Sequence, residues 1–232
     1  MAKEDTDQYI NYLQSEIAVF EASTDDRIHF LRTIAGGLQY SRVLDVGCGA
    51  GQELLRFVEM GATRCVGVDA QIAAGNIFRK FFADRGIENR VEFLNARSEH
   101  LPFSGACFDL VICRVALPYM NSHMALREME RVLDKFGRLV LTVHTPSFYW
   151  RMIRQRLTTF SARKMAYPCI CFLGGSWYWL TGKQPKGSFW KGKETFHTRG
   201  MLRRELDELG LQVQMEFASG GKGSRSFVIV KK

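Results

Sequence analysis

The sequence has few cysteines and histidines, and none is spaced as a metal ligand or a redox pair would be. Six cysteines and five histidines are scattered along 232 residues. Cys169 and Cys171 are separated by one residue, which is neither a zinc-ligand nor a thioredoxin spacing. We therefore expect no metal site, and we expect the cysteines to be buried thiols that pack as small hydrophobic side chains.

Long apolar runs are also missing. The first fifteen residues lack the hydrophobic stretch of a signal peptide, so we expect a cytoplasmic protein. Residues 165–182 are apolar, but Pro168, Gly174 and Gly175 interrupt them, which argues against a transmembrane helix. With 46% hydrophobic residues, the chain is long and apolar enough to fold as one globular domain.

Acidic residues are absent from one long stretch. Residues 147–193 contain no Asp or Glu but nine Lys or Arg, and the whole chain has a formal net charge of +8. This charge favours an anionic partner, such as a nucleic acid, a membrane surface or an acidic small molecule. Two aromatic clusters, 148–150 and 177–179, lie among the basic residues, which suits an anionic amphiphile, an anionic aromatic molecule or a membrane interface.

Elsewhere the apolar residues alternate between strand and helix spacing. Two helices are predicted within residues 1–37, the second beginning at Thr24 and ending at Gly36. The strands expected along the chain are residues 42–46, 64–68, 91–94, 108–113, 137–144, 211–217 and 226–230, the last two joined by a turn at Gly220-Gly221. The helices expected between them are residues 52–60, 72–85, 122–133 and 198–209.

This alternation predicts an α/β fold of the Rossmann-like, doubly wound kind. Its sheet has seven mostly parallel strands, and the strand at 108–113 is apolar on both faces, as a central parallel strand should be. We expect a single domain, residues 1–232. Its parts are N-terminal helices at 1–37, a ligand-binding core at 42–146, a basic aromatic lid inserted after the fifth strand at 147–197, and a C-terminal helix and strands at 198–232.

A glycine-rich loop follows the first predicted strand, with glycines at Gly47, Gly49 and Gly51. Glycines at such a turn let the backbone bend tightly and approach a ligand closely, although this G-x-G-x-G spacing differs from that of dinucleotide sites. Plain packing of the turn is the alternative interpretation. Asp69 ends the second predicted strand, where a carboxylate can accept both ribose hydroxyl protons of an adenosine.

The stretch from residue 42 to about residue 146 resembles class I S-adenosylmethionine (SAM)-dependent methyltransferases. It is most similar to their type-11 group, which includes the quinone-biosynthesis C-methyltransferases. The motifs are the loop 43–51, Glu99-His100-Leu101-Pro102-Phe103, Phe108-Asp109-Leu110-Val111, Ala125-Leu126-Arg127-Glu128, Arg131-Val132-Leu133 and Gly137-Arg138-Leu139-Val140. The resemblance implies an enzyme that uses SAM as its cofactor, and it says little about the substrate.

The resemblance also implies cofactor roles for particular residues. The loop glycines would face the methionine part of SAM, and Asp45 would help to hold its ammonium group. Asp69 would hold the ribose, and Ala70 would border the adenine. Cys113 and Arg114, at the end of the fourth predicted strand, would lie below the reactive sulfonium.

Two positions depart from the family pattern. Arg97 and Ser98 would flank the adenine edge, but the family usually has Asp where this chain has Arg97. Arginine cannot accept a hydrogen bond from the adenine amino group, which leaves the backbone amide of Ser98 for this contact. The frequent His-His pair of the family is Pro118-Tyr119 here, which removes an obvious base and weakens the case for quinone C-methylation.

Candidate catalytic residues lie after the fourth and fifth predicted strands, because ligands of open α/β sheets bind at the carboxyl ends of strands. Tyr119 and His144, with His123 behind them, are the candidates for a base or a substrate-orienting group. The alternative is that His144 is a hydrogen-bonded strand-end histidine and Tyr119 a packing aromatic. Methyl transfer from a sulfonium requires alignment more than a base, so a missing catalytic dyad does not argue against activity.

The leading hypothesis is a methyltransferase acting on a small molecule, hydrophobic or aromatic with an anionic part, beneath a mobile lid. Peripheral membrane contact of the lid is one version of it. An RNA- or DNA-directed enzyme is disfavoured, because residues 114–119 lack the Asn or Asp followed by Pro-Pro and an aromatic that base-amino methyltransferases present. A non-catalytic SAM-binding module is the remaining alternative.

Overall fold

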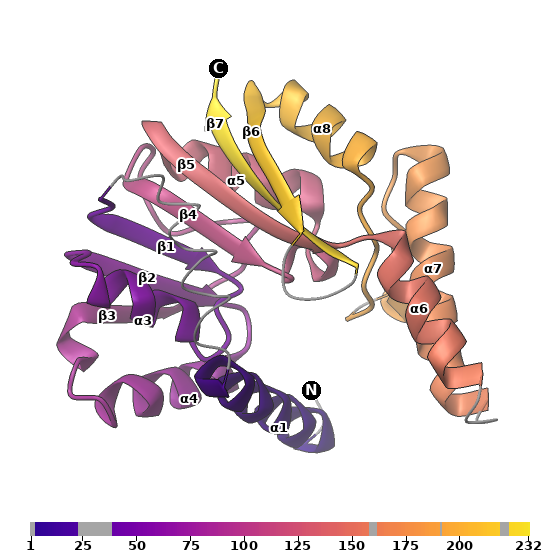
Figure 1. The fold of residues 1–232 in the computed structure, drawn as a ribbon, viewed down its shortest axis with the longest axis horizontal. Helices are drawn as coiled ribbons and strands as arrows, with labels where there is room; N and C mark the ends of the chain where they lie inside the picture. The colour runs from indigo at the N-terminus through magenta and orange to yellow at the C-terminus, as the bar shows by residue number, and fades with distance from the viewer. Residues whose placement is uncertain (1–2, 23–38, 158–161, 191, 219–222) are drawn as a thin grey trace.

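Seven strands form one sheet in the order β3-β2-β1-β4-β5-β7-β6 (Figure 1). This computed structural model describes residues 3–22, 39–157, 162–190, 192–218 and 223–232. The strands are β1 (Arg42–Val46), β2 (Arg64–Asp69), β3 (Val91–Asn95), β4 (Phe108–Arg114), β5 (Leu133–His144), β6 (Leu211–Ala218) and β7 (Ser224–Lys231). Strands β1 to β5 pair in parallel, and β7 runs antiparallel to both β5 and β6. The predicted Rossmann-like, mostly parallel fold is confirmed.

Helices cover both faces of the sheet. The α-helices are α1 (Lys3–Ala22), α3 (Gln52–Glu59), α4 (Ile72–Ala83), α5 (Ser122–Val132), α6 (Pro146–Leu157), α7 (Ala162–Thr181) and α8 (Arg199–Glu208). Short 3-10 helices are η1 (Glu88–Arg90), η2 (Leu117–Tyr119) and η3 (Ser188–Trp190). Helices α5 and α8 pack on one face of the sheet, and α3 and α4 pack on the other. The pair α6–α7 lies beyond the carboxyl end of β5 (Figure 1).

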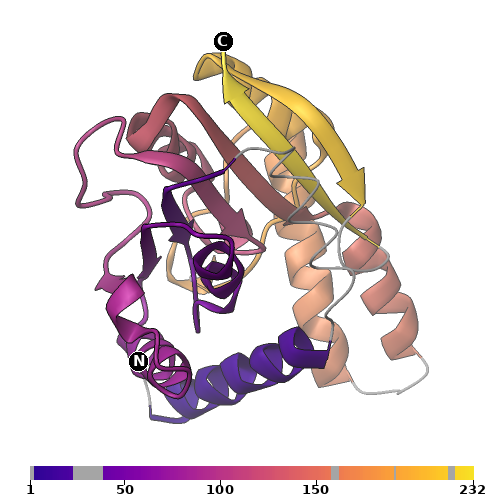
Figure 2. The same ribbon diagram turned by 60° about the vertical axis from the view of Figure 1, so that its left-hand side comes forward.

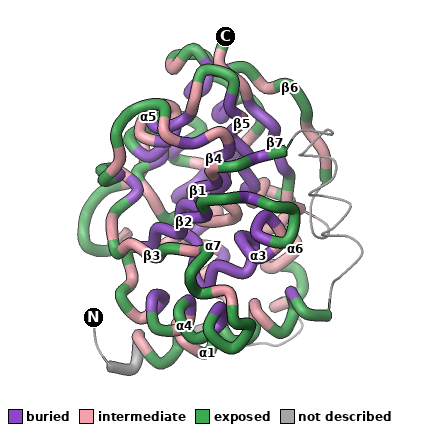
Figure 3. The backbone as a smooth tube through the Cα atoms, turned by 90° about the vertical axis from the view of Figure 1, so that its left-hand side faces the viewer, coloured by how far each residue is buried: buried purple, intermediate pink, exposed green. Residues whose placement is uncertain are grey.

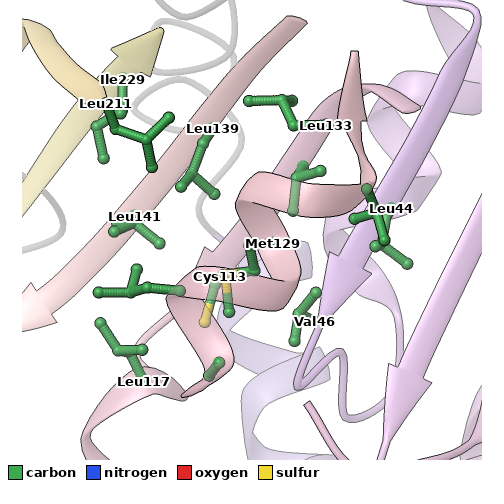
Figure 4. Packing of buried hydrophobic residues seen from close by; sticks show 14 of the residues in the cluster. Leu44, Val46, Cys113, Leu117, Met129, Leu133, Leu139, Leu141, Leu211 and Ile229 are labelled. Atoms are coloured by element: carbon green, nitrogen blue, oxygen red, sulfur yellow. The ribbon is translucent and has the colours of Figure 1, made fainter. Parts of the chain in front are cut away.

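The core is built from strand residues that alternate between the two faces. In β4, Val111 and Cys113 pack towards α5, whereas Leu110 and Ile112 pack towards α3 and α4. Figure 4 shows Met129 of α5 beside Cys113 in the first of these layers. Because both faces are covered, the central strands are buried, as the purple backbone of Figure 3 shows. This burial explains why residues 108–113 are apolar at nearly every position.

Strand β5 begins earlier than the expected residue 137. Leu133 pairs with Phe108, and the register then shifts so that Arg138 pairs with Leu110. The extra residues form an irregular stretch around Gly137, where an added Cβ would lie 2.7 Å from Leu133 Cδ1 and 3.0 Å from a backbone oxygen. Gly137 therefore permits a bulge within the strand, whereas the sequence pattern placed the start of the strand at this residue.

The segment expected to form a basic aromatic lid contains two paired helices, α6 and α7. Gly174 and Gly175, which appear to interrupt α7 in the sequence, are packing positions within it. A Cβ on Gly174 would lie 2.6 Å from the ring of Trp190, and one on Gly175 would lie 2.2 Å from the ring of Phe196. Among the described residues, no helix has the length and apolarity needed to cross a bilayer.

Two expectations fall on parts of the chain that are not described. The second N-terminal helix, predicted from Thr24 to Gly36, lies in the gap between residues 22 and 39. The turn at Gly220-Gly221 lies in the gap between residues 218 and 223.

Candidate active site

The glycine-rich loop bends back over the end of β2. Gly47, Gly49 and Gly51 have φ angles of 75°, 54° and 77°, a region that favours glycine. The amide of Gly47 donates to the carbonyl of Val68 at 2.7 Å. A Cβ on Gly47 would lie 2.3 Å from the Cβ of Ala116, so close packing also requires glycine here. The loop then leads into α3, whose N-terminus faces the same edge of the sheet.

Asp69 meets this loop, as the spacing predicts. Its carboxylate accepts hydrogen bonds from the amides of Gly49 at 3.0 Å and Gln71 at 2.8 Å, and from the hydroxyl of Tyr9 at 3.3 Å. Burial raises the pKa of Asp69, and the two amides act in the opposite direction. The carboxylate is thus held rigidly at the carboxyl end of β2, with the Tyr9 hydroxyl as its longest contact.

Asp45 belongs to a buried acidic group on the same side. The pKa of Asp45 is raised to about 8, by burial first and then by the charges of Glu53 and Asp69, against the opposing charge of Arg114. Arg114 is paired with Glu53. Asp45 thus interacts electrostatically with two other carboxyl groups and with one cation, an excess of acidic groups that favours a positively charged ligand. In addition, the side-chain oxygen of Gln52 is buried without a hydrogen-bond partner among the described residues, and it could accept from an ammonium group.

The expected adenine region has an open pocket and an outward-facing arginine. Ala70 borders a pocket of about 410 Å³ at the start of α4. Its lining residues are Thr6, Ala70, Gln71, Ile72, Ala73 and Asn76. Ser98 is buried, whereas Arg97 is exposed and pairs with Glu99 at 3.4 Å. The side chain of Arg97 is therefore directed to Glu99.

The two residues at the end of β4 point to opposite faces. The thiol of Cys113 packs in the core towards α5, and burial raises its pKa to about 12. Only the backbone of Cys113 can border a ligand at this edge, because its side chain is enclosed. Arg114 points towards α3, where it pairs with Glu53.

Helix α1 lies over the loop, a placement that the sequence does not reveal. Leu13 approaches Gly49 so closely that a Cβ there would lie 2.8 Å from Leu13 Cδ2. Leu13 also packs with Ala50 and Ala74, and Tyr9 joins the same cluster. In the view of Figure 2, α1 extends between α4 and α7. The helix therefore closes one side of the candidate site.

The other side holds a buried carboxylate that the sequence analysis missed, Glu194. It accepts hydrogen bonds from three tyrosine hydroxyls: Tyr119 of η2 at 2.6 Å, Tyr149 of α6 at 2.5 Å and Tyr167 of α7 at 2.9 Å. Burial, reinforced by the charge of Glu194, raises the pKa of each of these tyrosines well above its usual value. Tyr119 is thus a hydrogen-bond donor here, although part of its ring is exposed.

One sequence signal could have found Glu194. It is the first acid after the acid-free residues 147–193. A carboxylate that closes such a basic stretch is a candidate for an internal partner, but nothing local indicates that tyrosines from three different helices would meet it.

His144 ends β5 next to this cluster. Its Nδ1 lies 2.9 Å from the hydroxyl of Ser224, and its ring stacks on Phe148 with centroids 3.7 Å apart. Burial lowers the pKa of His144, against the opposing charge of Glu194, so the ring is neutral at neutral pH. The hydrogen-bonded strand-end interpretation left open for His144 describes these contacts. His123, by contrast, is exposed on α5.

Metal-binding and disulfide groups are not found in the described part of the chain. No set of three or more His, Cys, Asp or Glu side chains is placed there to hold a metal ion. All six cysteines are free thiols; four are buried as expected, but Cys107 and Cys169 are only partly buried.

Comparison with known proteins identifies the core. Residues 43–137 match the family described as a methyltransferase domain. This chain carries a class I SAM-dependent methyltransferase core. The predicted class I SAM-dependent methyltransferase core and its cofactor, SAM, are confirmed, and the buried acidic group described above suits a ligand with ammonium and sulfonium charges.

Relatives of this methyltransferase core share its sequence only in part. The uncharacterized methyltransferase YcgJ of Bacillus subtilis is 38% identical over 104 residues, covering 44% of this chain and 40% of that protein. The ubiquinone/menaquinone biosynthesis C-methyltransferase UbiE of Xylella fastidiosa is 34% identical over 118 residues, covering 47% and 45%. The chain thus spans less than half the length of these relatives.

A solved structure shares the fold over nearly the whole chain. Magnesium protoporphyrin IX methyltransferase from Synechocystis, with bound S-adenosylhomocysteine, aligns with a TM-score of 0.62 at 18% identity. The alignment covers 95% of this chain and 87% of that one. The similarity in fold therefore extends well beyond the family match at residues 43–137.

Proposed function

We propose that this chain transfers the methyl group of SAM to a small-molecule acceptor that is hydrophobic or aromatic and carries an anionic part. The relative UbiE is named for ubiquinone and menaquinone, which are small molecules, and this supports the small-molecule part of the proposal. The anionic part rests on a pocket that two arginines line.

That pocket lies where α6 meets the start of β7 and has a volume of about 540 Å³. Its lining residues are Ser147, Trp150, Arg151, Arg154, Gln155 and Gly223. Among the described residues, no carboxylate pairs with Arg151 or Arg154, and the Trp150 ring is largely exposed. Two guanidinium groups that have no carboxylate partner among the described residues, beside an indole ring, favour a ligand with a carboxylate or phosphate next to an apolar or aromatic body.

The pocket adjoins the strand-end histidine. Gly223 approaches Phe148 so closely that a Cβ there would lie 2.9 Å from Phe148 Cα, and Phe148 stacks on His144. We assign the anionic end of the acceptor to Arg151 and Arg154, with its reacting end directed inwards past His144.

We assign Glu194 as the base that takes the proton of the acceptor. An acceptor hydroxyl or amine that replaces the Tyr119 hydroxyl would donate to Glu194, which can take the proton released on methyl transfer. Tyr149 and Tyr167 would keep the carboxylate in position through their own hydrogen bonds. His144, neutral at neutral pH, is assigned to orienting the acceptor rather than to deprotonating it.

The cofactor side of the site takes the roles implied by the family. When bound, SAM supplies an electrophilic methyl group. Asp69 would hold the ribose hydroxyls, and Asp45 with the unpaired oxygen of Gln52 would hold the ammonium group. These residues bind and orient, which is the principal protein contribution to methyl transfer.

Two segments would exclude water from the reaction. Helix α1 covers the glycine loop, and the described residues between 147 and 197 form the opposite wall. Partial burial, and then charges that include that of Glu194, raise the pKa of the half-exposed Tyr12 of α1, and the influence of Glu194 indicates that the two segments approach each other there. We propose that residues 147–197 act as a cover over the acceptor.

The test is a methylation assay with SAM carrying a tritiated methyl group. Hydroxylated aromatic carboxylates, the corresponding neutral amides, and RNA are offered in parallel, and label is followed into each. We expect label in an aromatic carboxylate, with a raised KM for Arg154→Gln but not for Arg203→Gln, an exposed arginine on α8. The KM for the neutral amide should be the same in both variants as in the unmodified chain.

Label in RNA alone would replace this proposal with the nucleic-acid alternative. Tight SAM binding with no turnover of any acceptor would favour a non-catalytic module.

A further inference from the structure

Helix α7 carries an apolar stripe that no described part of the chain covers. Leu173, Trp177 and Leu180 are 64%, 56% and 74% exposed and recur at the i, i+4, i+7 spacing of one helix face. Phe189 of η3, 58% exposed, adjoins them, because its neighbour Trp190 packs on Gly174 of α7. We call these four residues, with Lys183, Lys186 and Lys193, the α7 face.

This stripe is additional to the side of α7 that forms core. Cys171 and Tyr178 are buried in the cluster that joins α6, α7 and α8. The helix is therefore apolar on two sides, and only one of them is used within the protein. Large exposed apolar side chains grouped on one helix face mark an interaction surface more often than isolated ones do.

Charge on the α7 face is of one sign. Lys183 and Lys186 are exposed and form no salt bridge with a described residue, and the Lys193 ammonium lies 4.1 Å from the centroid of the Phe189 ring. No acid occurs in residues 147–193, and Glu194 is buried beneath three tyrosines. An anionic partner would therefore meet lysines and no acid of this segment at the α7 face.

We propose that the α7 face docks on the surface of an anionic lipid bilayer. Tryptophan and leucine on one helix face, bordered by lysines, suit a helix lying in the interface, with its apolar side chains among the acyl chains and its ammonium groups at the phosphates. The helix cannot span the bilayer, so the contact is peripheral. This inference does not depend on the acceptor.

Other occupants fit the α7 face less well. A second copy of this chain, docked symmetrically, would bring the lysines of both copies together without any acid to neutralise them. A nucleic acid would pair with the lysines but leave Leu173 and Leu180 in contact with water or phosphate.

The test is cosedimentation of the full chain with vesicles of phosphatidylcholine alone or mixed equally with phosphatidylglycerol. We expect binding to the mixed vesicles only, and weaker binding as salt rises. Lys183→Gln combined with Lys186→Gln should weaken binding roughly 30-fold, since each lysine near an anionic surface contributes a factor of about five. Trp177→Ser combined with Leu180→Ser should abolish it.

The matched control is at the start of β5, at the opposite end of the sheet. Phe136 is 86% exposed and Lys135 lies against its ring, so Lys135→Gln combined with Phe136→Ser removes the same chemistry from another surface. This variant should bind vesicles as the unmodified chain does. Circular dichroism and SAM binding show whether each variant is folded.

Three results would overturn the proposal. The first is equal binding to both kinds of vesicle, or binding to neither. The second is an equal loss of vesicle binding in the control variant and in the α7-face variants. The third is a dimer, seen by sedimentation, that only the α7-face substitutions dissociate.

Discussion

Asp45 provides the sharpest prediction, because its pKa is raised to about 8 and the ligand proposed for it is cationic. At pH 7, a carboxyl group with that pKa is protonated in about nine of ten molecules. An ammonium group placed beside it favours the ionised form, so SAM binding should expel the proton. We expect release of about 0.9 proton per SAM at pH 7, falling towards zero above about pH 9.

The assay is isothermal titration calorimetry of SAM in buffers that differ in ionisation enthalpy. The apparent binding enthalpy then varies with the buffer in proportion to the protons released. Because an α-amino group titrates near pH 8, Asp45→Asn is measured in parallel, and the difference between the two proteins isolates Asp45. The same proton release in both proteins would refute the reasoning.

The same shift governs the stability of the protein without ligand. The folded pKa of about 8 lies above the ordinary value of 3.8, so the folded chain binds more protons than the unfolded chain between these values. The free energy of unfolding should therefore fall as pH rises from about 4 to 8, by at most about 1.4 kcal/mol per pH unit from this group. Urea denaturation of Asp45→Asn should lack this part of the slope.

Three other substitutions test single contacts. Gly47→Ala places a Cβ 2.3 Å from Ala116 at positive φ, and denaturation should show a loss of about 2 kcal/mol or more. Glu194→Gln should lower the alkaline titration midpoints of its tyrosines in ultraviolet spectra; unchanged midpoints would count against the cluster. Tyr9→Phe removes a 3.3 Å contact to Asp69 that a ribose hydroxyl would replace, so SAM affinity should not fall; a tenfold loss would show that Tyr9 contacts the cofactor.

The methyltransferase core is predictable from sequence because its signals are local. Strand and helix spacing place β1, β2 and β4 within a residue or so of their observed ends. The loop glycines and Asp69 meet because parallel strands end at one edge of the sheet, which topology alone guarantees. The start of β5 is misplaced because a bulge at Gly137 has the same local composition as a turn.

The acceptor side is not predictable in the same way. Glu194 is joined to Tyr119, Tyr149 and Tyr167 by contacts between η2, α6, α7 and the segment after η3, and no periodicity encodes such long-range pairing. The aromatic clusters also divide: Tyr149 and Tyr178 point inwards, whereas Trp150, Trp177 and Trp179 are largely exposed. Composition identified the residue types but not the direction in which each side chain points.

SAM affinity of Asp69→Ala tests the central claim most directly. If Asp69 holds the ribose, calorimetry should show SAM binding weakened by about 1.5–3 kcal/mol, roughly 10- to 150-fold in Kd, the scale of a lost charge-assisted hydrogen bond. Asp84→Ala, which removes an exposed acid at the end of α4, should bind SAM as the unmodified chain does. Unchanged affinity in a folded Asp69→Ala protein would contradict the assignment of the cofactor site.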